Sequence, residues 1–120
     1  MKVLIVEPGK AAYEAEIGNG LKDMQKAVGG YIQDLYPYDD PVGLVCNEEG
    51  KLEKLPWNRS LRDGEGKIYD IIAGTFFICG LNEDDDFDSL PPELMAKFKN
   101  QFHEPEMFRR IDDKIVSYRE

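Results

Sequence analysis

The first part of the chain consists of short segments that are either apolar or alternate apolar and polar residues. Turns rich in glycine and proline separate these segments. Residues 3–7 are aliphatic and β-branched and stop at a Pro-Gly pair, which predicts a buried strand. Residues 11–17 alternate apolar and acidic positions, which predicts a half-buried second strand antiparallel to the first. Residues 31–36 are aromatic and aliphatic, and residues 42–47 alternate, so each predicts a further strand.

Helical spacing replaces alternation in three places. Residues 21–28 carry one apolar face, with Asn19 as the expected cap and Gly29-Gly30 as the stop. A second helix is expected after Ser89, where two prolines and an acidic residue precede apolar positions four residues apart. Residues 105–118 also place apolar side chains at helical spacing, which predicts either a short helix or a poorly ordered tail.

The segment 42–61 holds the densest group of polar residues that alternate with apolar ones. Glu48-Glu49-Gly50 predicts a hairpin turn, with Gly50 at a positive φ angle and residues 52–55 as the returning strand. Residues 58–61 predict a turn or a single helical turn after Pro56. Further on, residues 69–81 are the most hydrophobic stretch, and their second half predicts a central strand.

This order of elements predicts an α+β fold: a small mixed or mainly antiparallel sheet with helices packed on one face. The chain of 120 residues is long enough for one core, and neither a repeat nor a linker divides it. We therefore expect a single α+β domain over residues 1–103, followed by a C-terminal helical extension or tail over residues 104–120.

The charge balance narrows the classes of partner. The net charge is −9, whereas phosphate backbones are bound by clustered Lys and Arg, so direct nucleic-acid binding is not expected. An acidic surface suits a basic protein partner, mimicry of nucleic acid or simple solubility. No apolar run approaches the ~20 residues that span a bilayer, and the first residues lack the pattern of an export signal. We expect a cytoplasmic protein without a membrane partner.

Catalytic and metal-binding patterns do not emerge from the residue types. His103 is the only histidine, and Cys46 and Cys79 lie in apolar runs, where buried hydrophobic roles are more typical than a disulfide. The acidic run 82–88 lacks the spacing of a calcium loop, and the glycines form no phosphate-binding motif. The sequence implies no cofactor and favours a non-enzymatic role.

Five polar or aromatic residues are the candidate ligand- or partner-binding set: Asn47, Glu48, Trp57, Asn58 and Arg59. In a purely structural interpretation, Asn58 caps a helical turn and Arg59 pairs with a carboxylate. In a functional interpretation, Arg59 presents its guanidinium to an anionic ligand, and Trp57 stacks on the ligand or anchors a protein interface.

Several segments together also carry a family resemblance. They are residues 1–10, 24–25, 28–32, 44–52, 55–56, 58–59 and 70–78. With them, the first two-thirds of the chain resembles the domain of unknown function 3846 family, whose members are small proteins of Firmicute conjugative elements and phages. The resemblance implies no catalytic residue. Its genetic context implies a role in counter-defence or in maintenance of a mobile element.

These observations lead to three hypotheses. The leading one is a non-enzymatic binding module of a mobile element or phage, which binds a host protein or sequesters a small ligand. The second is an acidic mimic of nucleic acid, as in antirestriction. The third is a small enzyme on a nucleotide-like substrate that uses Glu48, Asn58 and Arg59. The unpaired edges of a small sheet also favour a homodimer.

Overall fold

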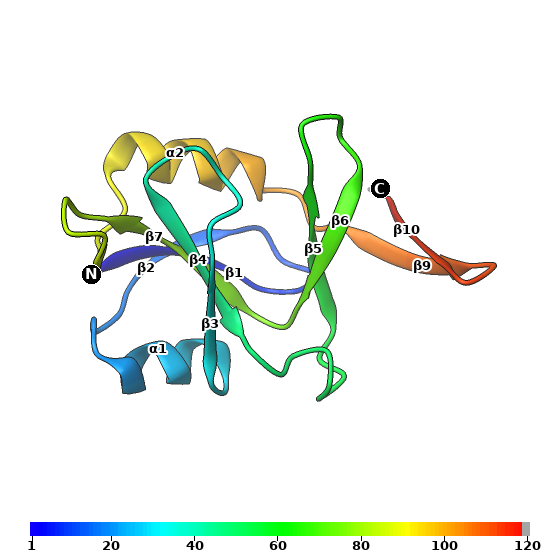
Figure 1. The fold of residues 1–120 in the computed structure, drawn as a ribbon, viewed down its shortest axis with the longest axis horizontal. Coiled ribbons are helices and arrows are strands. Elements are labelled where there is room, and N and C mark those ends of the chain that lie inside the picture. Colours follow the sequence, from blue (N-terminus) through cyan, green and yellow to red (C-terminus); the bar gives the residue numbers. More distant parts are fainter. Residues whose placement is uncertain (119–120) are drawn as a thin grey trace.

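The computed structural model describes residues 1–118, which form a central sheet with a helix on each side and two smaller hairpins (Figure 1). All strand pairs in this part of the chain are antiparallel. The main sheet has the order β2-β1-β7-β4-β3, and the short strand β8 pairs antiparallel with β7. Its strands are β1 (Lys2–Val6), β2 (Tyr13–Glu16), β3 (Ile32–Leu35), β4 (Val42–Asn47), β7 (Phe76–Leu81) and β8 (Phe87–Asp88). The α+β class and the mainly antiparallel sheet are confirmed.

The two helices, α1 (Leu21–Val28) and α2 (Pro92–Gln101), lie on opposite faces of this sheet (Figure 1). Successive side chains of a strand point to opposite faces. In β1, Val3 therefore packs in the core cluster that contains α1, and Leu4 packs in the cluster that contains α2. Because the central strands are apolar on both faces, each face needs a cover. Both helices are predicted on one face, and the structure differs from that prediction.

Helix α1 has the predicted length but not the predicted cap. Gly20, rather than Asn19, is the N-cap residue, and no side chain caps the helix. Gly29 ends the helix in the left-handed conformation (φ 78°), and its N–H donates to the Gln25 carbonyl at 2.8 Å. The glycine stop is confirmed.

The chain after β4 does not return as the second strand of a hairpin. Residues 48–54 instead form consecutive turns, in which the Glu53 N–H donates to the Glu49 carbonyl at 2.8 Å. Gly50 does not have a positive φ angle. Glycine is instead needed at position 50 because a Cβ there would lie 2.5 Å from the Ala73 carbonyl oxygen. The predicted hairpin and the predicted strand at residues 52–55 are therefore wrong.

A separate two-stranded sheet runs across the main sheet (Figure 1). Its strands are β5 (Trp57–Arg62) and β6 (Ile68–Ala73). The turn predicted at residues 58–61 is wrong, because these residues are buried in the middle of β5 and residues 59–61 pair with β6. Gly74, at φ 85°, separates β6 from β7, and the predicted central strand is confirmed in β7.

The last described residues form a hairpin of β9 (Met107–Ile111) and β10 (Lys114–Tyr118). Asp112 and Asp113 have φ angles of 47° and 66°. Two consecutive positive φ angles define the type I′ turn that joins neighbouring strands most tightly. The predicted helix is therefore wrong, and the last two residues of the predicted tail lie outside the described residues. Neither helix within residues 1–118 has the length and apolar character needed to cross a bilayer.

Candidate functional site

Asn58 is fully buried at an irregular point of β5. The register shifts between Trp57 and Arg59, so Asn58 is the extra residue of a β-bulge. Bulges redirect side chains, and here the Asn58 amide points into the protein. Its Nδ2 donates to the Val6 carbonyl at 2.8 Å and to the Gly74 carbonyl at 2.9 Å. Asn58 thereby connects the end of β1 to the turn between β6 and β7.

Arg59, the next residue, is also buried, with 1% of its surface exposed. Its Nη1 donates to Asn58 Oδ1 at 2.9 Å, and its Nη2 donates to the carbonyls of Lys10 at 2.7 Å and Phe102 at 2.9 Å. A buried guanidinium is costly unless its donors are satisfied. We call Asn58 and Arg59 the polar hub. It joins β5 to the turn between β1 and β2 and to the end of α2.

A cleft with a volume of about 400 Å³ lies between the β3–β4 edge of the main sheet and β6. Asn47 is held in its wall, because its Nδ2 donates to the Val28 carbonyl at 3.3 Å and its Oδ1 accepts from the Glu49 N–H at 2.8 Å. Glu48 lines the same cleft and is exposed. The Lys51 ammonium donates to the Asp70 carboxylate, and both residues line the cleft.

A second hollow, of about 430 Å³, adjoins the first, and Lys51, Asp70 and Ile71 line both. Trp57, Tyr69 and Ile115 line this second hollow. We call the two hollows together the binding groove. It runs along β6 from the end of β4 to the C-terminal hairpin.

The structure divides the predicted site residues into two groups. Asn47, Glu48 and Trp57 line the binding groove. Asn58 and Arg59 form the polar hub inside the protein, where they hydrogen-bond to each other and to main-chain carbonyls. The groups are thus neighbours in sequence but not parts of one surface.

Lys51 and Asp70 belong to the groove but carried no signal in the sequence. They lie 19 residues apart, and their pairing depends on the turns at 48–54 lying beside β6. Since the sequence pattern predicted a different path for residues 48–55, it could not bring these two charges together. Tyr69, another groove residue, is only one of several exposed tyrosines.

The two cysteines are free and buried, as their apolar context predicted. Burial raises the pKa of the Cys46 thiol from its ordinary value of 9.0 to about 11, and that of Cys79 to about 12. A thiolate, not a thiol, is the nucleophile, so neither cysteine is activated at neutral pH. Within residues 1–118, no group of three or more His, Cys, Asp and Glu side chains could hold a metal ion.

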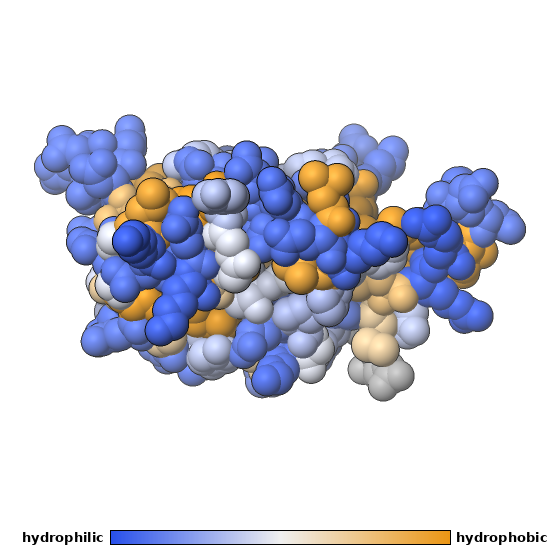
Figure 2. Space-filling model, turned by 90° about the horizontal axis from the view of Figure 1, so that it is seen from below, coloured by the Kyte–Doolittle hydropathy of each residue, from blue (hydrophilic) through white to orange (hydrophobic). Residues whose placement is uncertain are grey.

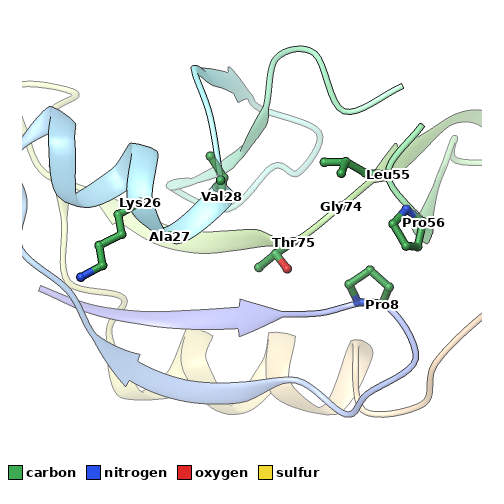
Figure 3. A pocket seen from close by; sticks show the side chains of 9 residues that line it. Pro8, Lys26, Ala27, Val28, Leu55, Pro56, Gly74 and Thr75 are labelled. Carbon is green, nitrogen blue, oxygen red and sulfur yellow. The ribbon is translucent and has the colours of Figure 1, made fainter. Parts of the chain in front are cut away.

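Another pocket, of about 450 Å³, lies between the C-terminal end of α1 and the turn before β7 (Figure 3). Pro8, Leu55 and Pro56 line it together with Thr75 and Lys26. Figure 3 shows the Thr75 hydroxyl near the two prolines, and the Lys26 ammonium pointing away from Thr75. The pocket offers mainly apolar contact and does not bring together an acid and a base.

The fold and the site define a small antiparallel α+β domain with a buried polar hub and an open, amphipathic groove. The chain belongs to the family described as "Domain of unknown function (DUF3846)", which matches residues 1–103. This match extends beyond the segments that carry the sequence resemblance, and it ends before β9. No curated protein and no solved structure matches the chain.

Proposed function

We propose that the protein is a non-enzymatic binding module that holds an extended segment of a partner protein in the binding groove. The observation that carries this proposal is that two hollows lie next to each other along β6 and share Lys51, Asp70 and Ile71 in their linings. Each hollow falls within the range of about 300–1,000 Å³ that is typical of ligand sites. An elongated groove of two such hollows suits a polypeptide segment better than one compact molecule.

The chemistry of the groove differs between its ends. Glu48 provides a carboxylate at the β4 end and Asp70 provides one where the two hollows adjoin, so a basic side chain of the partner would be favoured in this half of the groove. Trp57 and Tyr69 provide aromatic surface at the other end, where an apolar side chain would anchor. The Lys51–Asp70 ion pair is exposed, and such pairs contribute about 0–1 kcal/mol. Breaking this ion pair to form contacts with a partner therefore costs little free energy.

The two other hypotheses have less support from the arrangement of residues. Glu48 lines the groove, whereas Asn58 and Arg59 are enclosed, so these three cannot converge on one substrate. A nucleic-acid mimic needs carboxylates in a row along one face. The acidic turns at residues 48–53, 63–65 and 82–86 lie at three separate corners of the molecule (Figure 1).

In the genetic context that the family resemblance implies, the partner would be a host protein. The module would then act in counter-defence or in maintenance of a mobile element. A small ligand in the 400 Å³ hollow is the second candidate, because the fixed Asn47 amide lines that hollow together with the Lys51 and Asp70 charges.

Selection of random peptides displayed on phage against the immobilised protein tests the proposal. We expect enriched peptides that combine a basic residue with an aromatic or aliphatic one. On ¹⁵N-labelled protein, they should shift the amide signals of Gln33, Lys51 and Asp70. No enrichment, or shifts confined to the pocket around Pro8 and Thr75, would overturn the proposal, and so would multiple turnover of any substrate.

Two pairs of variants sharpen this experiment. Trp57→Ala should weaken peptide binding, whereas Tyr31→Ala, which removes an exposed aromatic ring outside the groove, should not. Asp70→Lys should weaken the binding of basic peptides, whereas the same reversal at exposed Glu65 should not. The unfolding midpoint of each variant shows whether a loss of binding is a loss of fold.

A further inference from the structure

We propose that the free edge of β10 is a self-association surface, at which a second copy of this chain adds its own β10 in antiparallel orientation. The two copies would be related by a two-fold axis and would share a four-stranded sheet. This inference concerns the edge of β10, whereas Ile115 of the same strand lines the binding groove. Its test is the oligomeric state of the protein without a peptide, so its failure and the failure of the proposed function are distinguishable.

The C-terminal hairpin has an anchored face and an exposed face. On the anchored face, the Phe108 ring packs edge-to-face on Trp57 with 5.8 Å between ring centroids, and Ser117 Oγ donates to Glu106 Oε2 at 2.6 Å. The six residues of the other face are all exposed: Met107, Arg109, Ile111, Lys114, Val116 and Tyr118. Its four large apolar or aromatic side chains are 41–47% exposed. Figure 2 shows hydrophobic side chains among hydrophilic ones on this projecting arm.

The hairpin also has two open edges. Within residues 1–118, β9 and β10 pair only with each other. A two-stranded ribbon is marginally stable alone, and an unpaired edge is a template for another strand. An additional strand would therefore both cover an edge and stabilise the hairpin.

The sequence of β10 suits pairing with its own copy. In an antiparallel pair with two-fold symmetry, the central residue lies opposite itself, and residues equally far from it lie opposite each other. In β10 the centre is Val116, which would meet Val116, while Lys114 would meet Tyr118. The first pair is apolar, and the second joins an ammonium to an aromatic ring.

The edge of β9 does not suit the same arrangement. Its central residue is Arg109, which would lie opposite Arg109 of the second copy. Like charges directly opposite each other destabilise a strand pair. The residues themselves thus select the β10 edge.

The distribution of charge also favours the C-terminal hairpin as the site of self-association. The whole chain carries −9, so two copies repel each other over most of their surface. The hairpin over residues 107–118 has three basic and two acidic residues, which gives 3 − 2 = +1. It projects from the body (Figure 1), and the molecule measures 44 × 29 × 23 Å. Contact through this arm keeps the two acidic bodies apart.

Sedimentation velocity of the full chain over a range of concentrations tests the inference. We expect a monomer–dimer equilibrium that Val116→Lys weakens at least about tenfold, because it places two ammonium groups opposite each other. Ile111→Lys changes the same exposed face on β9 and should leave the dimer unaffected. A monomer at every concentration would overturn the inference, as would a dimer that Val116→Lys does not weaken.

Cross-linking provides a second, positive readout if Val116→Lys disturbs the hairpin. With diamide as oxidant, Val116→Cys should form a disulfide-linked dimer, whereas Ile111→Cys should not. The native cysteines are buried and should not interfere. Equal cross-linking of both variants, or of neither, contradicts two-fold pairing centred on Val116.

Discussion

Arg59 Nη1 donates a hydrogen bond of 2.9 Å to Asn58 Oδ1, so two consecutive residues of β5 satisfy each other inside the protein. They also donate to main-chain carbonyls of β1, of the turn after it, of the turn before β7 and of the end of α2. The polar hub therefore fixes the second sheet against the first. It also sets the position of β6, which forms one wall of the binding groove.

Replacement of Arg59 by methionine tests the structural role of the polar hub. Arg59→Met keeps the length of the side chain but removes the donors to Asn58 Oδ1, to the partly buried Lys10 carbonyl and to the Phe102 carbonyl, which still accepts from the Ala12 N–H. An unsatisfied buried acceptor costs about 1–3 kcal/mol, and partial relaxation limits the sum, so we expect a loss of about 2–5 kcal/mol. Urea unfolding measures this loss.

Arg62→Met is the matched control, because Arg62 lies on the same strand and is exposed. Exposed substitutions usually change stability by no more than about 0.5 kcal/mol. Equal unfolding midpoints for the two variants would refute the structural role assigned to Arg59.

The Glu106 carboxylate is expected to hold the C-terminal hairpin on the domain. It accepts hydrogen bonds from the Ser60 N–H at 3.1 Å, from Ser60 Oγ at 2.7 Å and from Ser117 Oγ at 2.6 Å. Glu106→Gln replaces one acceptor oxygen with a donor and should cost about 1–3 kcal/mol at this contact. We expect faster amide hydrogen exchange in β9 and β10 but unchanged exchange in β7.

Glu53→Gln, in an exposed turn, is the control for this change and should leave the hairpin unaffected. If exchange accelerates uniformly through the main sheet, the Glu106 contact supports the whole fold rather than the hairpin. The local role would then be wrong.

Gly50 is expected to tolerate no side chain, because a Cβ there would lie 2.5 Å from the Ala73 carbonyl oxygen. Gly50→Ala should push the turn away from β6 and destabilise the protein by about 1–3 kcal/mol, as overpacking does. Gly64→Ala is the control, since nothing lies within 4 Å of its Cβ and its φ angle is not positive. Thermal unfolding compares the two variants. Equal midpoints would show that the turn moves to accept a Cβ at position 50 without loss of stability.

The buried thiols predict a specific dependence on pH. Burial raises the pKa of Cys46 to about 11 and that of Cys79 to about 12, above the ordinary value of 9.0. A group whose pKa is raised by folding contributes stability below its unfolded pKa and loses that contribution as the pH rises through the folded pKa. This contribution to the free energy of unfolding should therefore fall between about pH 9 and 12.

Reaction with a thiol reagent checks the same property at neutral pH. Both cysteines should react slowly in the folded protein and rapidly in urea. Replacement of each cysteine by alanine assigns the two rates. Rapid reaction of either thiol in the folded state would contradict the burial that raises its pKa.

Local patterns predicted most of the main sheet and both helices. The alternation in β2 and the helical spacing of α1 are properties of neighbouring residues, so the sequence displays them directly. The conformation and burial of β5 depend instead on groups that are distant in the sequence. Asn58 and Arg59 bind carbonyls 52 and 43 residues away, on Val6 and Phe102. Polar residues that are buried by such contacts look like a turn when they are considered alone.

The lining of the groove could be predicted from the sequence only in part. Residue type and position indicate Asn47, Glu48 and Trp57 as candidate binding residues, and all three line the groove, while their binding of a partner stays a prediction. Lys51 and Asp70 were missed because only the path of the chain brings them together. The C-terminal hairpin was missed because its apolar positions also fit a helix, while Asp112-Asp113 is a weaker turn signal than a pair with glycine.

The fluorescence of Trp57 during titration with a groove-selected peptide tests whether the binding groove holds a peptide. Trp57 is the only tryptophan, lines the groove and is half-buried, so its emission reports occupancy without a label. The account predicts a saturable change in emission whose midpoint equals the dissociation constant from calorimetry. Binding by calorimetry without any change in Trp57 emission would contradict it.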